Sequence, residues 1–143
     1  MIIYFDTSAL MKLFVTEQHS EITQRFAAES ARVVVSQITW VEMCAGLALK
    51  QRTHQVNADI SATALDQLRL EWPRYLRLAI DDDLTAEAGD LAQRFGLRAY
   101  DSIQLASAQR AHRQLGRNLL FCCFDKQLNA AATALGIGVA PLG

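Results

Sequence analysis

The stretch IIYFDTSAL, residues 2–10, decides the fold class. Its first four residues are large and apolar without polar alternation, which is typical of a strand buried on both faces of a parallel sheet. A carboxylate, Asp6, and two hydroxyls, Thr7 and Ser8, follow at once, and a helix-like segment comes next. The sequence therefore predicts a buried strand that ends in an acidic side chain.

The rest of the chain continues this alternation of strand and helix. Apolar runs rich in β-branched or large residues predict further strands at 33–36, 76–80, 119–124 and 138–140. Helical periodicity predicts helices at 9–13, 20–29, 40–51, 62–70, 85–95, 102–115 and 126–135. The pattern indicates a single α/β domain over residues 1–143, with a parallel β-sheet flanked by helices on both faces in a three-layer α/β/α arrangement.

Composition argues against several classes of protein. With 51% hydrophobic residues, 20% charged residues and two prolines, the chain is typical of an ordered globular protein. The net charge of −1 argues against indiscriminate coating of nucleic acid. Neither the three cysteines nor the three histidines show metal-binding spacing. Without a signal peptide or an apolar run long enough for a membrane helix, we expect a cytoplasmic protein with no membrane contact.

Four acids stand out when each is weighed against a purely structural role. Asp6 and Asp125 follow predicted strands and Asp101 precedes a helix, so each of the three fits a helix N-cap. Glu42 fits a capping box that begins at Thr39, yet it is the only charge in the segment WVEMCAGLAL. Topology rules place the ends of the first and fourth strands along the carboxyl edge of the sheet, where open α/β proteins bind ligands.

Carboxylates gathered at that edge need compensation. Two of them about 4 Å apart repel by roughly 4 kcal/mol at an effective dielectric of 20, against a typical stability of about 5–15 kcal/mol. Either a cation neutralises the cluster or some of the acids are protonated. Oxygen ligands with hydroxyls nearby, from Thr7, Ser8 and Ser36, select a hard ion such as Mg²⁺ or Mn²⁺, and this is the chemistry of phosphodiester hydrolysis.

Four stretches resemble the PIN-domain ribonucleases in order and spacing: IIYFDTSAL, SQITWVEMCAGL, GLRAYDSIQLASA and LLFCCFDKQL. Within that group, the length and the stretch GLRAYDSIQLA resemble VapC-type toxins of prokaryotic toxin–antitoxin pairs. The resemblance spans essentially the whole chain. It implies a Mg²⁺- or Mn²⁺-dependent endoribonuclease that cleaves RNA, forms a homodimer and receives a segment of a cognate antitoxin protein close to its active site.

Carried over residue by residue, the resemblance implies a catalytic acidic quartet of Asp6, Glu42, Asp101 and Asp125. Asp6 and Asp101 would bind the metal directly, and Glu42 and Asp125 would bind it directly or through water. One position departs from the family's pattern. A Thr or Ser often stands two residues before the last acid, and here Cys123 stands there, which weakens the expected hydroxyl support beside Asp125.

Hydroxyls and cations near the acids would complete such a site. The resemblance implies hydrogen-bond support from Thr7 or Ser8 and from Ser36. Phosphate contacts require cations, which fit a solvated surface equally well, and the nearest in sequence are Lys12, Arg98 and Lys126.

Two other functions stay open at this point. An aspartyl-nucleophile phosphatase also places Asp after its first strand, but that chemistry wants a second acid two residues later, where Ser8 stands. A non-catalytic receiver-like or metal-binding signalling module of the doubly wound type would carry a phosphate-accepting Asp after a central strand. The predicted strands 33–36 and 76–80 are instead followed by Gln37 and by the polar run 81–83.

The helix predicted at 40–51 is apolar nearly all round its first ten residues. A helix on the face of an α/β sheet normally keeps a polar outer stripe, so another surface should cover this one. Either the helix at 62–70 covers it within the chain, or the two helices together form a groove and a dimer face.

Overall fold

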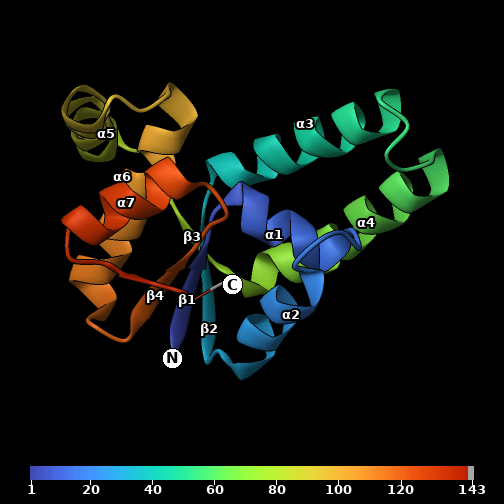
Figure 1. The fold of residues 1–143 in the computed structure, drawn as a ribbon, viewed down its shortest axis with the longest axis horizontal. Helices are drawn as coiled ribbons and strands as arrows, with labels where there is room; N and C mark the ends of the chain where they lie inside the picture. The colour runs from blue at the N-terminus through green and yellow to red at the C-terminus, as the bar shows by residue number, and fades with distance from the viewer. Residues whose placement is uncertain (142–143) are drawn as a thin grey trace.

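Five parallel strands form the centre of the protein (Figure 1). The structure, a computed structural model, describes residues 1–141, so the last two residues of the predicted domain lie outside the described part. The sheet has the order β3-β2-β1-β4-β5. Its strands are β1 (Ile2–Phe5), β2 (Arg32–Ser36), β3 (Leu76–Leu78), β4 (Leu119–Cys122) and β5 (Gly138–Val139).

The helices connect these strands in the predicted order. They are α1 (Thr7–Phe14), α2 (Ser20–Glu29), α3 (Ile38–Arg52), α4 (Ala58–Glu71), α5 (Asp82–Phe95), α6 (Ala99–Leu115) and α7 (Lys126–Ala134), with a short 3-10 helix, η1 (Trp72–Arg74), after α4. Several helices begin earlier than predicted because their first turns are polar and lack apolar periodicity. Asn57 caps α4 and Asp81 caps α5, each accepting a backbone N–H of the first turn.

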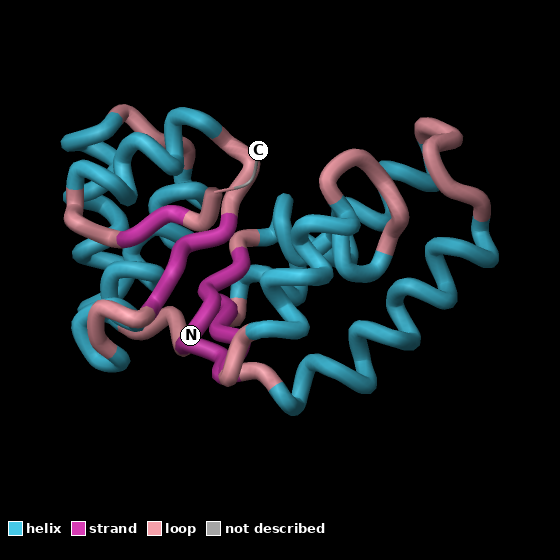
Figure 2. Tube along the Cα trace, turned by 60° about the horizontal axis from the view of Figure 1, so that its bottom comes forward, coloured by secondary structure: helices cyan, strands magenta, loops and turns pink. Residues whose placement is uncertain are grey.

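The helices cover the two faces of the sheet in two groups (Figures 1 and 2). Helices α1 to α4 enclose one core, which contains Ile3 and Phe5, and α5 to α7 enclose the other, which contains Tyr4 and Phe121. Neighbouring residues of β1 therefore point into opposite cores, as side chains alternate along a strand. The predicted three-layer α/β/α fold with a parallel sheet is confirmed.

The order of the strands reverses between β1 and β4. The chain first adds β2 and β3 on one side of β1, and then returns to place β4 on the other side, with Phe5 aligned to Cys122. Because both strands are parallel, their carboxyl ends meet at one edge of the sheet. Such a switch point is where open α/β sheets bind their ligands.

Helices α3 and α4 form an arm that extends away from the sheet (Figures 1 and 2). They pack against each other through the core that contains Met43, Leu47, Ala64 and Leu68. The prediction that α4 covers α3 within the chain is therefore confirmed on the inner side of the arm. On the outer side, Val41 and Leu49 are 61% and 50% exposed.

Two leucines of α4 allow a test of which side of the arm contributes to the stability of the protein. Leu68 is fully buried and Leu70 is 75% exposed. We expect Leu68→Ala to lower the free energy of unfolding by about 2–5 kcal/mol, because it removes buried methyl groups and leaves a cavity. Leu70→Ala should change it by less than about 0.5 kcal/mol. Urea denaturation of both variants measures this, and equal losses would contradict the packing described for α4.

Candidate active site

Asp6 lies at the switch point, between the end of β1 and the start of α1. Its Oδ1 accepts the Ala9 N–H at 3.0 Å and the Ser8 hydroxyl at 2.8 Å, so the predicted N-cap role is confirmed. The side chain is almost fully buried, and this burial raises the pKa of Asp6 to about 6. Hydrogen bonds from Cys123, Ala9 and Ser8 oppose the rise in pKa, and the charge of Glu42 adds to it.

Glu42 lies in the second turn of α3 and faces groups from other elements. Its Oε1 accepts hydrogen bonds from Thr7 Oγ1 and from Gln104 Nε2, both at 2.8 Å. The capping-box interpretation is wrong, because α3 already begins at Ile38 and Thr39 is buried inside the helix. The lone carboxylate of this helix is therefore held by tertiary contacts and not by its own backbone.

Gln104 is the residue of this site that sequence reasoning missed. It is 2% exposed, and its Oε1 accepts the Tyr4 hydroxyl at 2.6 Å. Its Nε2 donates to Glu42 at 2.8 Å and to Thr39 at 2.9 Å, with Thr7 at 3.2 Å. The Tyr4 hydrogen bond fixes which end of the amide faces Glu42. One feature of the sequence could have indicated this role. Gln104 is a lone amide in a largely apolar helical segment, three residues after Asp101.

The other two acids lie at the starts of α6 and α7. Asp101 is in the first turn of α6, whose N-cap is Arg98, so an N-cap role for Asp101 is wrong. Partial burial raises the pKa of Asp101, the charges of Asp125 and Glu42 raise it further, and Arg98 opposes them. Asp125 is the N-cap of α7, as predicted, and its Oδ1 accepts the Leu128 N–H at 2.9 Å.

Cys123 stands between Asp6 and Asp125. Its Sγ accepts the Asp125 N–H at 3.2 Å, and it also contributes a hydrogen bond to Asp6. Burial, with the neighbouring charge of Asp6, raises the pKa of the Cys123 thiol, so the thiol keeps its proton. Where the family often has a hydroxyl, this protein thus has a thiol, which is a weaker hydrogen-bond donor and acceptor and contacts both acids.

The remaining predicted residues occupy different positions around the acids. Thr7 and Ser8 bond directly to Glu42 and Asp6, whereas Ser36 Oγ accepts the Ile38 N–H at 3.2 Å at the start of α3. Arg98 and Lys126 are exposed beside Asp101 and Asp125. Lys12 is engaged in an ion pair with Glu17 at 3.1 Å.

The donor set of the site suits a hard cation. Among residues 1–141, no three His, Cys, Asp or Glu side chains are grouped closely enough to enclose a metal ion. Burial is the main cause of the raised pKa values of Asp6 and Asp101, and the charges of neighbouring acids, Glu42 for both and Asp125 for Asp101, add to it. Mg²⁺ usually keeps several of its waters and takes one or two carboxylates together with substrate phosphate, so it does not require a closed ligand cage. The oxygen-rich, electronegative cluster fits that mode of binding.

A parallel α/β/α sheet with acids at its switch point defines the class of protein, and comparison with known proteins identifies the family. The PIN domain profile matches residues 3–133. Ribonuclease VapC46 of Mycobacterium tuberculosis is 34% identical over 137 residues, which cover 96% of this chain and 95% of the relative. Ribonuclease VapC49 of the same organism is 30% identical over 144 residues, covering 98% and 95%.

A solved structure agrees with these sequence matches. A toxin–antitoxin complex from Klebsiella pneumoniae contains a chain that is 25% identical, with a TM-score of 0.61 and coverage of 86% of each chain. The protein belongs to the PIN domain family. The predicted resemblance is therefore confirmed, while the roles assigned to the individual acids stay predictions.

The network around Gln104 generates a stability prediction. We expect Gln104→Leu to lower the free energy of unfolding by at least about 2 kcal/mol, because it removes the acceptor of the buried Tyr4 hydroxyl and one of the two hydrogen bonds that Glu42 accepts. Tyr4→Phe should cost about 1 kcal/mol in the parent chain and nothing further in the Gln104→Leu background. Gln114→Leu, at an exposed position of α6, is the control. Urea denaturation measures the cycle, and additive losses would contradict the network.

Proposed function

We propose that this protein is an endoribonuclease that hydrolyses RNA phosphodiester bonds with Mg²⁺ or Mn²⁺, and that it acts as the toxin of a toxin–antitoxin pair. The proposal is supported by the positions of Asp6 and Asp125 just after the paired strands β1 and β4, and by the charges of Glu42 and Asp125, which add to the burial that raises the pKa values of Asp6 and Asp101. Membership of the PIN domain family and the ribonuclease names of the relatives support the same activity.

The chain's own residues would position the acids for this chemistry. When bound, a divalent ion would lower the pKa of a water and stabilise charge on the phosphate. Asp6 and Asp101 would hold the ion directly, with Glu42 and Asp125 acting directly or through water. The hydrogen bonds that Glu42 accepts within residues 1–141 all go to Oε1, so Oε2 is left for the site. Likewise, Asp125 uses Oδ1 as the helix cap and keeps Oδ2.

The two rival functions are less compatible with the site. β1 is the central strand, so Asp6, and not a residue after β2 or β3, occupies the place of a phosphate-accepting aspartate. It is only 6% exposed, however, and its Oδ1 already accepts two hydrogen bonds. A buried and engaged carboxylate is a poor phosphate acceptor, which disfavours both a signalling module and an aspartyl-nucleophile phosphatase.

The cleavage activity itself can be tested on a purified, nuclease-free preparation. We expect RNA cleavage with Mg²⁺ or Mn²⁺, none after chelation with EDTA, and recovery when the ion is restored. Asp101→Asn keeps the shape of the side chain and removes its charge, so cleavage should fall at least about 100-fold. Asp90→Asn, at an exposed position of α5, should cleave at the parent rate. A folded Asp101→Asn protein with full activity would overturn the proposed site.

A cognate antitoxin is the second part of the proposal. A groove of about 540 Å³ lies between α1, α2 and α4, where its lining includes Leu13, Phe14, Ala28, Val33, Leu70 and Tyr75. Helices α3 and α4 pack on each other through their shared core, so we place the partner segment in this groove and not between those two helices. An apolar groove between helices suits the apolar face of an amphipathic helix, and we assign it to a segment of the antitoxin. The similarity to a toxin–antitoxin complex supports this choice.

We also propose that the protein forms a homodimer through the outer surface of α3. Val41 and Leu49 are exposed there, next to exposed alanines at 45 and 48, so the surface lacks the usual polar stripe. Separately, no helix among residues 1–141 combines the length and the hydrophobicity needed to cross a bilayer. We propose a cytoplasmic location because the proposed substrate is RNA.

Two charge substitutions separate the two proposed interfaces. We expect Ala28→Glu, in the groove, to abolish co-purification with the product of the neighbouring antitoxin gene and to leave the self-association unchanged. Val41→Glu should instead shift the mass of the chain alone toward the 15.9 kDa of one copy. Each variant is the control for the other, because both bury a charge only if their own interface forms. Light scattering over a dilution series measures both, and a monomer at every concentration would contradict the dimer.

A further inference from the structure

A stacked pair of rings lies beside the acidic quartet. The ring of His19 packs on that of Phe124, with 5.3 Å between centroids and 16° between planes. Phe124 immediately precedes Asp125, and its N–H donates to Ser8 Oγ at 3.3 Å. The Ser8 hydroxyl donates in turn to Asp6 at 2.8 Å. The ring pair is therefore tied to one acid through the backbone and to another through a single hydroxyl.

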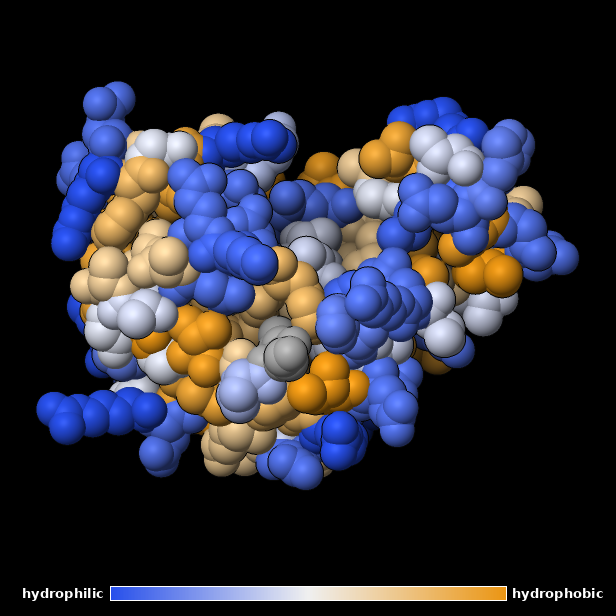
Figure 3. Space-filling model, viewed as in Figure 1, coloured by the Kyte–Doolittle hydropathy of each residue, from blue (hydrophilic) through white to orange (hydrophobic). Residues whose placement is uncertain are grey.

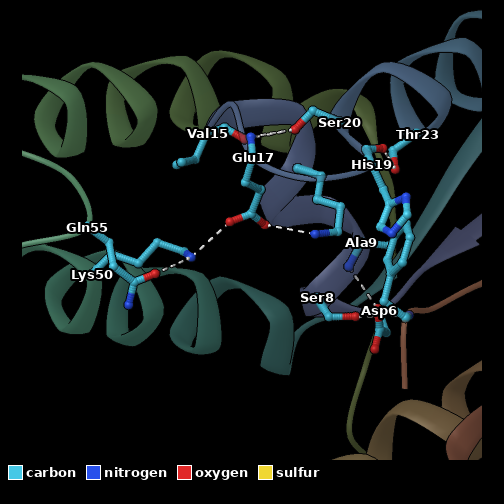
Figure 4. Close-up of polar contacts among 12 residues, drawn as sticks. Asp6, Ser8, Ala9, Val15, Glu17, His19, Ser20, Thr23, Lys50 and Gln55 are labelled. Carbon is cyan, nitrogen blue, oxygen red and sulfur yellow. Dashed lines mark hydrogen bonds and ion pairs between the residues drawn. The ribbon is translucent and has the colours of Figure 1, made fainter. Parts of the chain in front are cut away.

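Two lysines and a glutamate lie near this ring pair. Lys12 Nζ lies 4.7 Å from the centroid of the Phe124 ring. Glu17 bridges Lys12 at 3.1 Å and Lys50 at 2.9 Å, and Figure 4 shows Glu17 between these contacts, with His19 and Asp6 nearby. One acid is thus outnumbered by two lysines. These lysines bring positive charge close to the rings, which also lie next to Asp6 and Asp125 of the acidic quartet.

The backbone conformation at His19 suits histidine but does not require a ring. His19 has φ 69° and precedes α2 without making a side-chain capping bond. This left-handed conformation is uncommon for residues other than glycine, and asparagine, aspartate and histidine adopt it more readily than most. The imidazole is exposed and lines a hollow of about 600 Å³, whose other lining residues are Thr16, Glu17, Ser20, Glu21, Ile22 and Arg25. Its ring stacks on Phe124 on one face, so the other face is available to a ligand.

We propose that the His19–Phe124 pair is a stacking platform for a nucleobase of the RNA substrate, adjacent to the phosphate that is cleaved. The proposal rests on the proposed ribonuclease function. Bases of single-stranded RNA stack on aromatic side chains, and such stacking tolerates different base identities. Phe124 supports the His19 ring from below, and Lys12 holds positive charge beside it for the neighbouring phosphate. The hollow next to His19 has more than enough volume for one base.

The platform is tested by binding of a short single-stranded RNA in the Asp101→Asn background, where the RNA stays intact. We expect His19→Asn to weaken binding about tenfold, because it removes the ring and keeps a residue suited to the left-handed backbone. His19→Trp, which restores a ring, should recover most of the affinity. His54→Asn is the matched control, since His54 is also exposed and left-handed, with φ 59°, but lies in the turn between α3 and α4.

Abasic substitutions in the RNA show whether the effect comes from a base. An abasic nucleotide at one position should weaken binding to the protein with His19 about tenfold and have no further effect with His19→Asn. Additive losses, or equal binding by His19→Asn and His54→Asn, would overturn the platform, and the His19–Phe124 contact would then only stabilise the turn before α2. Cleavage by the otherwise unaltered chain is measured in parallel. Its absence would refute the ribonuclease function, whereas cleavage without dependence on His19 would refute the platform alone.

Discussion

The site depends on the burial of one carboxylate, that of Asp6, where the order of the strands reverses. An ion removed from water is costly unless hydrogen bonds or an opposite charge replace the solvent. Ala9, Ser8 and Cys123 supply hydrogen bonds, but the pKa of Asp6 still rises to about 6. The compensation within the chain is therefore incomplete, and a bound cation would complete it. The same deficit at Asp101, beside Glu42 and Asp125, extends the electronegative region across both sides of the switch point.

The hydrogen bonds of Gln104 join the two helical layers at the same edge of the sheet. Gln104 belongs to α6 on one face of the sheet, whereas Thr39 and Glu42 belong to α3, which packs on the other face. Their hydrogen bonds meet above the end of β1, and the buried Tyr4 hydroxyl orients the amide from below. A change at Gln104 would disturb both the position of Glu42 and the contact between the layers. The Gln104 amide therefore couples the stability of the fold to the geometry of the site, because the same side chain links the two helical layers and holds Glu42.

Sequence patterns predicted the layers of the fold because apolar strands and helical periodicity reflect burial directly. They also predicted that Asp6 and Asp125 lie at the same edge of the sheet, because parallel strands have their carboxyl ends at one edge. The start of α4 was missed because the segment that follows Asn57 is polar, and the role of Gln104 was missed because its partners lie far away along the chain. The capping box at Thr39 matched a local pattern, but a tertiary network satisfied Glu42 instead. Local rules fail in this protein where hydrogen bonds connect distant elements.

The overall charge limits how such a protein can hold RNA. A net charge of −1 argues against many phosphate contacts spread over the whole surface, which supply most non-specific affinity. In the proposed function, RNA binding would be concentrated near the acids, where a divalent ion would reverse the local charge and where Lys12, Arg98 and Lys126 lie close in sequence to the quartet. Stacking adds affinity that does not depend on charge and requires an unpaired base. The proposed stacking platform would therefore favour cleavage in single-stranded loops over cleavage in continuous duplex.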